Sequence, residues 1–227
     1  MDVILDNLDV VGLAYAYTLA AFVLAGIGSL LLGTLLAAMR VGPVAVLRRA
    51  AAVYVILIRN TPLLLVLIFM RKAGPKVGLT FNFVDLQIGD LRINNLFTAC
   101  VIALVLYTSA FVCEAIRSGV NAVPLGQAEA ARAIGLPFFD VMREIVLPQA
   151  VRATVPPLAS VQIALLKNTT VAGALGLAEA FVRLRGFLND NPGDRIALFV
   201  GFALIFVVLV EVISLTAHRL ERRWRIA

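Results

Sequence analysis

The chain has 227 residues, of which 61% are hydrophobic and only 15% are charged. A water-soluble domain usually carries about 45–50% apolar and about 25% charged residues, so this composition excludes an ordinary soluble protein and predicts lipid as the solvent. The formal net charge of +6 comes without aromatic residues interleaved among basic ones. It therefore favours loops that face anionic lipid headgroups and argues against a nucleic-acid partner.

The start of the chain combines an acidic segment with a long apolar run. Residues 1–12 carry only negative charges, whereas a signal peptide begins with positive ones, so the apolar run that follows is expected to remain in the protein. Because the start of the chain is acidic and its end is basic, residues 1–12 are predicted to be an extracytoplasmic N-terminal segment. The first predicted span covers about residues 13–39 and contains no charged residue. Gly26, Gly28 and Gly33 lie within it and predict close contact with neighbouring helices.

The second predicted span covers about residues 50–70 and is interrupted by one charged residue, Arg59. Pro62 has no backbone N–H to donate to the carbonyl of Ile58, so we expect a kink beside Arg59. In the polar segment that follows, residues 80–88 alternate between apolar and polar side chains, which indicates a small strand.

Three further predicted spans bring the total to five, at about residues 95–116, 156–177 and 196–217. The third span contains Cys100 and Cys113, which point to different faces of one helix. We expect two buried thiols and no disulfide. The single histidine of the chain has no second ligand near it at metal spacing, so no metal site is predicted.

Five spans place the two ends of the chain on opposite sides of the membrane. With the N-terminus outside, the inside segments hold eleven Lys and Arg residues and the outside segments hold seven. Positive residues favour the cytoplasmic side. The sequence therefore predicts a multi-pass protein of the cytoplasmic membrane, with its N-terminus outside and its C-terminus inside. Residues 118–152 are then a cytoplasmic loop, and residues 219–227 are a cytoplasmic basic tail.

The loop segment 123–150 is too polar to cross a membrane and reads as two short helices with a sharp turn. Pro124 suits a helix start, Gly135 can adopt the left-handed turn, Pro137 starts the second helix and Pro148 is expected to end it. Each helix is about 15 Å long at 1.5 Å per residue. On pattern alone, an ordinary amphipathic connecting loop explains the segment equally well.

The residue identities in this loop go further than the pattern. They resemble the signature cytoplasmic loop of ABC importer permeases, which reads Glu-Ala-Ala, then Gly, then Ile-x-Leu-Pro. The matching positions are Glu129, Ala130, Ala131, Gly135, Ile145, Leu147 and Pro148. The resemblance implies an all-α integral membrane protein of the type I ABC importer permease fold, with its transmembrane domain at residues 13–218. It also implies that the loop forms a coupling helix that docks on a separate nucleotide-binding subunit.

Other segments resemble the polar amino-acid permeases within that family, and the resemblance covers about residues 12–218. The matching segments are Arg59-Asn60-Thr61-Pro62-Leu63, the stretch from Ser109 to Gly119, Pro124-Leu125-Gly126-Gln127 with Pro148-Gln149-Ala150, and Lys167-Asn168-Thr169-Thr170. The chain departs from the family pattern at Phe111, Ser118, Asn168 and Thr170. The change at Asn168 matters most, because it removes a carboxylate beside Lys167. The form of the last segment is similar to glutamate permeases of actinobacteria.

Several charged residues fall at membrane depth, where a lone cation costs about 2.5–3.5 kcal/mol on insertion scales. Arg59 and Lys167 are candidates for the border of a translocation path, together with Asn60, Thr61, Pro62, Asn168, Thr169 and Thr170. The alternative is that both cations reach the membrane surface, or bind carbonyls and lipid headgroups. Glu114 and Arg117 are expected to form a local pair near a helix end. Glu211 fits either a helix–helix hydrogen bond or the path.

The chain lacks the Gly-x-x-x-x-Gly-Lys-Ser/Thr loop that cradles nucleotide phosphates, so it is not expected to be an enzyme, and ATP and Mg²⁺ belong to a partner. The resemblance implies a complex with two ATPase subunits, a second permease that is homologous or identical, and an extracytoplasmic solute-binding protein. The alternatives are a self-contained channel or secondary transporter for small anions or amino acids, and a membrane scaffold without transport.

Overall fold

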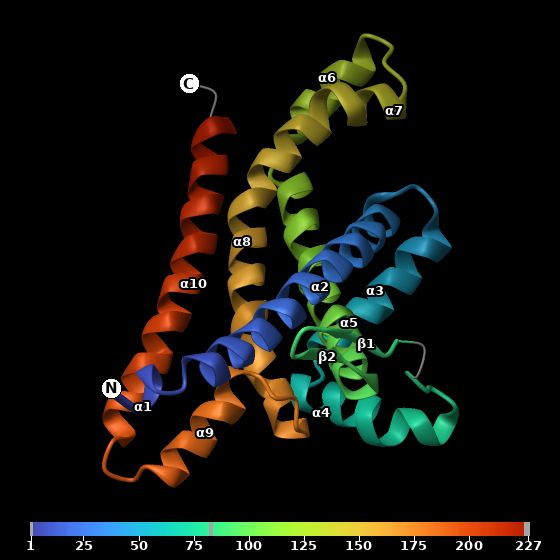
Figure 1. Cartoon of the computed structure of the whole chain (residues 1–227). Coiled ribbons are helices and arrows are strands. Elements are labelled where there is room, and N and C mark those ends of the chain that lie inside the picture. Colours follow the sequence, from blue (N-terminus) through green and yellow to red (C-terminus); the bar gives the residue numbers. More distant parts are fainter. Residues whose placement is uncertain (1, 82–83, 225–227) are drawn as a thin grey trace.

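The computed structural model describes residues 2–81 and 84–224, and nearly all of its regular structure is helical (Figure 1). The longer helices are α2 (Leu8–Val41), α3 (Ala45–Arg59), α5 (Asn95–Asn121), α8 (Leu147–Ala172), α9 (Ala180–Asp190) and α10 (Arg195–Trp224). The shorter helices are α1 (Asp2–Leu5), α4 (Leu63–Ile68), α6 (Leu125–Ala133) and α7 (Phe138–Asp140). Two π-helical turns (Phe69–Ala73 and Val141–Val146), two 3₁₀ turns (Gly74–Val77 and Gly173–Leu175) and the antiparallel strands β1 (Leu86–Ile88) and β2 (Leu91–Ile93) complete the described elements.

Helix α5 lies at the centre of the bundle and packs closely against α2 and α8. A Cβ atom on Gly28 would lie 2.6 Å from Val105, and one on Gly33 would lie 2.5 Å from Val112. Real side chains do not approach so closely, so both positions need glycine. The prediction that these glycines permit close helix contact is confirmed. In a membrane the hydrophobic effect does not drive helices together, so close approach of two backbones at small residues is what allows them to pack.

Four helices in the described part are long and apolar enough to cross a membrane, and a fifth candidate span consists of two helices separated by a sharp break. The helices Ala45–Arg59 and Leu63–Val77 meet at an angle of 101°. The predicted kink at Pro62 is confirmed and is larger than a proline alone produces. Asn60 and Thr61 are non-helical there, and the Thr61 hydroxyl donates to the carbonyl of Leu57 (2.8 Å).

The fourth span corrects the sequence analysis. Pro148 does not end a helix but lies in the first turn of α8, and Pro156 and Pro157 lie inside that helix instead of opening it. The helical segment runs from Phe138 to Leu175 without a break that separates it into two. Each of these prolines lacks the N–H that a continuous helix would use, and the packing of α8 against α5 holds the helix together across them. The second arm of the loop and the fourth span are therefore one continuous rod.

The structure adds three details to the predicted elements. The polar stretch between the fourth and fifth spans contains the amphipathic helix α9. The predicted basic tail continues α10 as far as Trp224, and residues 225–227 lie outside the described part. The predicted strand at 80–88 is a three-residue strand, β1, and residues 82 and 83 are also outside the described part. Cys100 and Cys113 are buried and free, as predicted.

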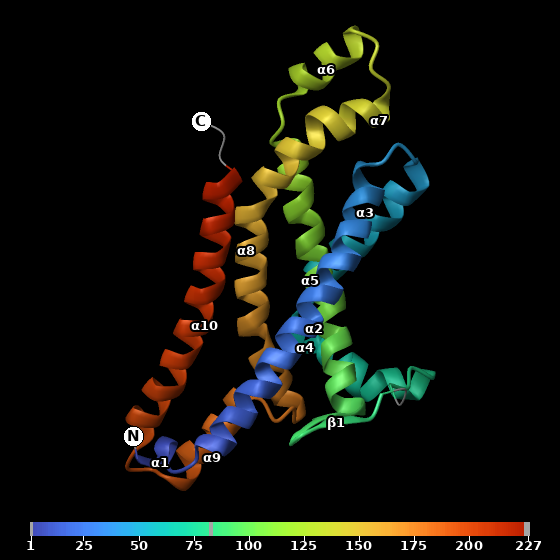
Figure 2. The same ribbon diagram turned by 45° about the horizontal axis from the view of Figure 1, so that its top comes forward.

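The two ends of the bundle carry different structures (Figures 1 and 2). Helices α6 and α7 project beyond the bundle at the end where α10 finishes. Helices α1 and α9 lie at the opposite end. The segment with the sequence motif is therefore far from the N-terminal end of α2.

The contact of α2 with α5 generates a stability prediction. Replacing Gly33 by Ala should lower the apparent melting temperature of the detergent-purified protein by several degrees, because overpacking typically costs about 1–3 kcal/mol. Gly12→Ala on the same helix is the matched control, since a Cβ there meets nothing within 4 Å, and it should leave the melting temperature unchanged or higher. Equal melting temperatures for the two variants would contradict the packing described here.

Candidate coupling loop and substrate cavities

The turn between α6 and α7 is built around Gly135. Its φ is +91°, a left-handed conformation that favours glycine. The Gly135 N–H donates to the carbonyl of Arg132 (3.0 Å), and the Leu136 N–H donates to the carbonyl of Ala131 (3.1 Å). These bonds satisfy the last carbonyls of α6 and reverse the chain into α7. The predicted turn at Gly135 is confirmed.

The loop has a small hydrophobic core of its own, so it is a folded unit and not a flexible connection. Val123, Ala131, Val141, Val146 and Ala150 form this buried cluster, and Ile145 packs against it. The side-chain amides of Gln127 and Gln149 join the two arms. Within the sequence motif, Ala131 and Ile145 therefore face inward. The remaining motif residues, Glu129, Ala130, Gly135, Leu147 and Pro148, are exposed.

Two exposed apolar side chains flank the turn, and the sequence analysis missed both. Ile134 is 82% exposed and Phe139 is 81% exposed. Both side chains therefore lie at the surface of the folded loop and are available for contact. The available signal was their position on either side of the Gly135 turn, in a segment that does not cross the membrane.

Glu114 is the centre of a charge cluster and not half of a local pair. Its carboxylate contacts Arg117 (3.3 Å) on its own helix, Arg59 (3.6 Å) at the end of α3, and Arg40 at the end of α2. The predicted pair with Arg117 exists, but Glu114 lies within α5, and three elements contribute arginines. Arg40 was missed because nothing in its sequence context brings α2 next to Glu114.

A cavity of about 400 Å³ opens beside this cluster, at the break of the second span. Its polar lining consists of Arg40, Arg59, Asn60, Glu114 and Arg117. The Arg59 guanidinium lies 5.8 Å from the centroid of the Phe111 ring, in range of a cation–π contact. Three arginines and one carboxylate leave the cavity with a net positive charge.

A second cavity of about 300 Å³ lies between α5 and α8, and Phe111 lines both cavities. Its polar lining is uncharged and consists of Tyr107, Thr108, Ser160 and Asn168. The Thr108 hydroxyl is buried and has no hydrogen-bond partner within the described residues. The two cavities together offer cationic and neutral hydrogen-bonding groups at neighbouring positions.

The segment 167–170 does not act as one surface. Asn168 lines the cavity beside Phe111, while Thr169 is fully buried and its hydroxyl donates to the carbonyl of Leu166 (2.7 Å). Lys167 and Thr170 line a different groove, formed with α9 and α10. The structure therefore brings Asn168 near the Arg59 cavity and places Lys167 elsewhere, because successive helix positions point in different directions.

Comparison with known proteins identifies the family. Residues 29–226 match the family described as binding-protein-dependent transport system inner membrane component. The chain belongs to this family. The permease is 40% identical to the glutamate transport system permease protein of Corynebacterium efficiens over 92% of each chain. It is 32% identical to a probable glutamine ABC transporter permease protein of Bacillus subtilis, over 98% of this chain and 97% of that one.

A solved structure supports the same fold. The crystal structure of an amino acid ABC transporter with histidines superposes with a TM-score of 0.82 at 27% identity, and the match covers 97% of this chain and 96% of that one. The expected type I importer permease fold is confirmed. Chains of this family carry no ATPase site, so the permease works with an ATPase and a substrate-binding protein.

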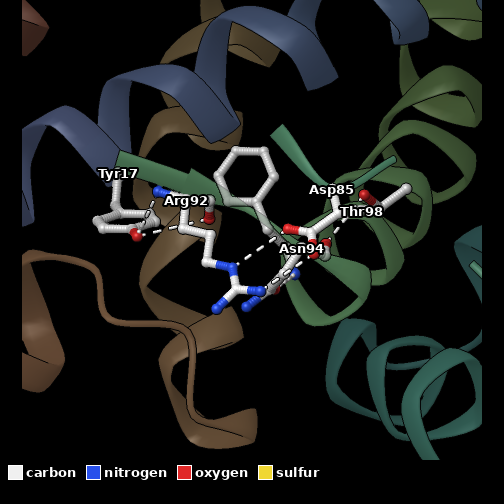
Figure 3. A network of polar contacts seen from close by, with 6 residues as sticks. Tyr17, Asp85, Arg92, Asn94 and Thr98 are labelled. Atoms are coloured by element: carbon white, nitrogen blue, oxygen red, sulfur yellow. Dashed lines mark hydrogen bonds and ion pairs between the residues drawn. The ribbon is translucent and has the colours of Figure 1, made fainter. Parts of the chain in front are cut away.

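A polar network stabilises the end of the permease opposite the candidate coupling loop, residues 118–152 (Figure 3). The Tyr17 hydroxyl of α2 accepts from the Arg92 N–H (2.8 Å), and the Arg92 guanidinium donates to both carboxylate oxygens of Asp85. This contact lowers the pKa of Asp85. Asn94 caps α5 by accepting from the Phe97 N–H (3.1 Å). The strands β1 and β2 are therefore fixed to both α2 and α5.

Glu179 fixes the start of α9 and is fully buried. Its two carboxylate oxygens accept from the N–H groups of Phe181 (2.8 Å) and Val182 (3.0 Å). A Cβ on Gly173 would collide with the carboxylate, so only glycine fits there. Burial raises the pKa of Glu179 to about 7, against the opposing effect of the two N–H groups.

The raised pKa of Glu179 generates a pH prediction. Between pH 4.5, the ordinary pKa of a glutamate, and about pH 7, the folded permease keeps a proton on Glu179 that the unfolded chain releases. The free energy of unfolding therefore falls as the pH rises through that window. Glu179→Gln keeps an acceptor oxygen and removes the charge. It should exceed the wild type in stability by up to about 3 kcal/mol at pH 8 and match it at pH 5.

The measurement is the apparent melting temperature in detergent at both pH values. Asp190→Asn on the same helix removes an exposed carboxylate and should show no such pH-dependent difference. A Glu179→Gln variant that is less stable than the wild type at both pH values would show that the ionised carboxylate is the better cap.

Proposed function

We propose that this chain is the permease subunit of an ABC importer for a polar amino acid, with glutamate as the substrate. The observation that carries the proposal is its 40% identity with a glutamate transport system permease protein over nearly the whole length of both chains. The net positive cavity at the break of the second span supports an anionic substrate.

The exposed face of the coupling loop is the proposed docking site for the ATPase subunit. Ile134 and Phe139 would enter an apolar groove of that subunit, and the Glu129 carboxylate would bind a cation or amide at its rim. The loop has its own core, so a push on this face moves it as a body. The assembly we propose contains two such permeases, homologous or identical, two ATPase subunits and an extracytoplasmic binding protein.

The proposed orientation follows from this docking. The coupling loop and the finish of α10 lie at one end of the molecule, which we assign to the cytoplasm. The N-terminal end of α2 lies at the other end, which we assign to the outside. The distribution of Lys and Arg residues supports the same assignment.

The proposed substrate path runs past Phe111. Arg59 and Asn60 line one of the two cavities that this ring borders, and Asn168 lines the other. A substrate carboxylate can take the place of Glu114 beside Arg59, because both are carboxylates and the guanidinium is half exposed. Thr61 and Pro62 shape this site by breaking the helix. Lys167, Thr169 and Thr170 do not line these two cavities.

Coupling is tested at the turn of the loop. Gly135→Ala forces a side chain into a left-handed conformation, at a cost of about 1–2 kcal/mol, and should tilt the docking face. We expect glutamate-stimulated ATP hydrolysis of the reconstituted importer to fall several-fold. Gly126→Ala in α6 is the matched control, because its φ is not positive and a Cβ meets nothing within 4 Å. Full stimulation in the Gly135 variant would refute the docking role.

The proposed path is tested with a variant that removes the positive charge of Arg59. Arg59→Gln should reduce ATP-dependent glutamate uptake into proteoliposomes about tenfold or more, since a hydrogen bond to a charged group contributes roughly 1.5–3 kcal/mol. Arg48→Gln on the same helix removes an exposed cation outside the cavity and should leave uptake unchanged. Glutamate flux through this chain in vesicles without ATP would instead support a self-contained transporter.

A further inference from the structure

A long groove runs between α8, α9 and α10, separate from the two cavities of the proposed path. Its volume is about 800 Å³, and its lining is mostly apolar. The aromatic and aliphatic part of the lining comes largely from one face of α10, at Phe199, Phe202, Ala203, Phe206, Val207 and Val210. Only 17% of the apolar window of α10 is buried in the chain. Much of this helix therefore contacts something other than its own chain.

Three charged side chains line the same groove: Lys167, Arg185 and Glu211. None of the three has a hydrogen bond or ion pair from its side chain within the part of the chain that the structure describes. Unpaired charges next to hydrocarbon are costly. Both cations come from the part of the chain around the α8–α9 connection, since Arg185 lies on α9 and Lys167 lies in the last two turns of α8.

The dimensions of the groove fit half of a bilayer. The apolar face of α10 extends from Phe199 to Val210, which are twelve residues separated by eleven rises of 1.5 Å, or about 16 Å. The hydrocarbon core of a membrane is about 30 Å thick, so one leaflet contributes about 15 Å. Glu211 follows at the far end of this face, more than two turns of α10 away from Phe202.

We propose that this groove binds an anionic phospholipid. Its phosphate lies at the α9 end between Lys167 and Arg185, and its acyl chains lie along the apolar face of α10. The lipid neutralises the two cations and covers a helix that the chain itself covers little. The proposal requires that the chain cross a membrane, and it does not depend on which solute is transported. It also accounts for the placement of Lys167 away from the Arg59 cavity.

The first experiment measures lipid binding to the detergent-purified importer complex by native mass spectrometry. Phosphatidylglycerol should bind the wild type more tightly than phosphatidylcholine. In the Lys167→Gln/Arg185→Gln variant, affinity for phosphatidylglycerol should fall about tenfold, while affinity for phosphatidylcholine stays the same. Arg183→Gln is the matched control, because Arg183 is exposed on the same helix but does not line the groove. It should bind phosphatidylglycerol as the wild type does.

A second experiment needs no charge variant and so remains informative if the double variant does not assemble. Photoactivatable phosphatidylglycerol is cross-linked to the wild-type complex, and the labelled peptides are identified. Labels on α9 and on residues 199–210 support the proposal. Labelling only elsewhere, equal binding of both lipids, or unchanged binding by the double variant would overturn it. A cross-link from Ala203→Cys to the second permease subunit would overturn it as well, since a protein would then fill the groove.

Discussion

The close contact of α5 with its neighbours is the constraint on which the rest of the structure depends. Gly33 of α2 lies against Val112 of α5. Near the end of α5, Gly119 lies against Thr154 of α8. The hydrophobic effect does not drive helix association within lipid, so the bundle is held by close backbone approach and by van der Waals contacts between fitted side chains. A side chain at either glycine would separate helices that hold the charge cluster and the coupling loop in place.

This constraint gives the coupling loop a stiff base. The two helices that enter and leave the loop touch each other at Gly119 and Thr154, and the Thr154 hydroxyl is bonded to the carbonyl of Ala150. The second arm of the loop continues into α8 as one rod from Phe138 to Leu175. This rod connects the loop directly to the turn of α8 that carries Asn168. The same rod reaches Lys167 and the groove beside α10.

The charge cluster has a mechanical and an electrostatic consequence. Glu114 joins the ends of α2 and α3 to α5, so the broken second span is fixed at its break. One carboxylate shared among three arginines leaves excess positive charge in a site bordered by the Phe111 ring. This excess charge is the physical basis of the proposed anionic substrate, because an anion beside Arg59 would reduce the repulsion among the arginines.

The sequence by itself determined the membrane location, the kink at Pro62 and the turn at Gly135. Each of these follows from local chemistry: the length of an apolar run, a missing N–H, or a left-handed residue. The tertiary structure alone decided that Pro148 and Pro156 lie within one helix and that Arg40 reaches Glu114. It also decided that Arg59 and Lys167 line different cavities. These features depend on which helices pack together and on which face each presents, and no local pattern in one segment contains that information.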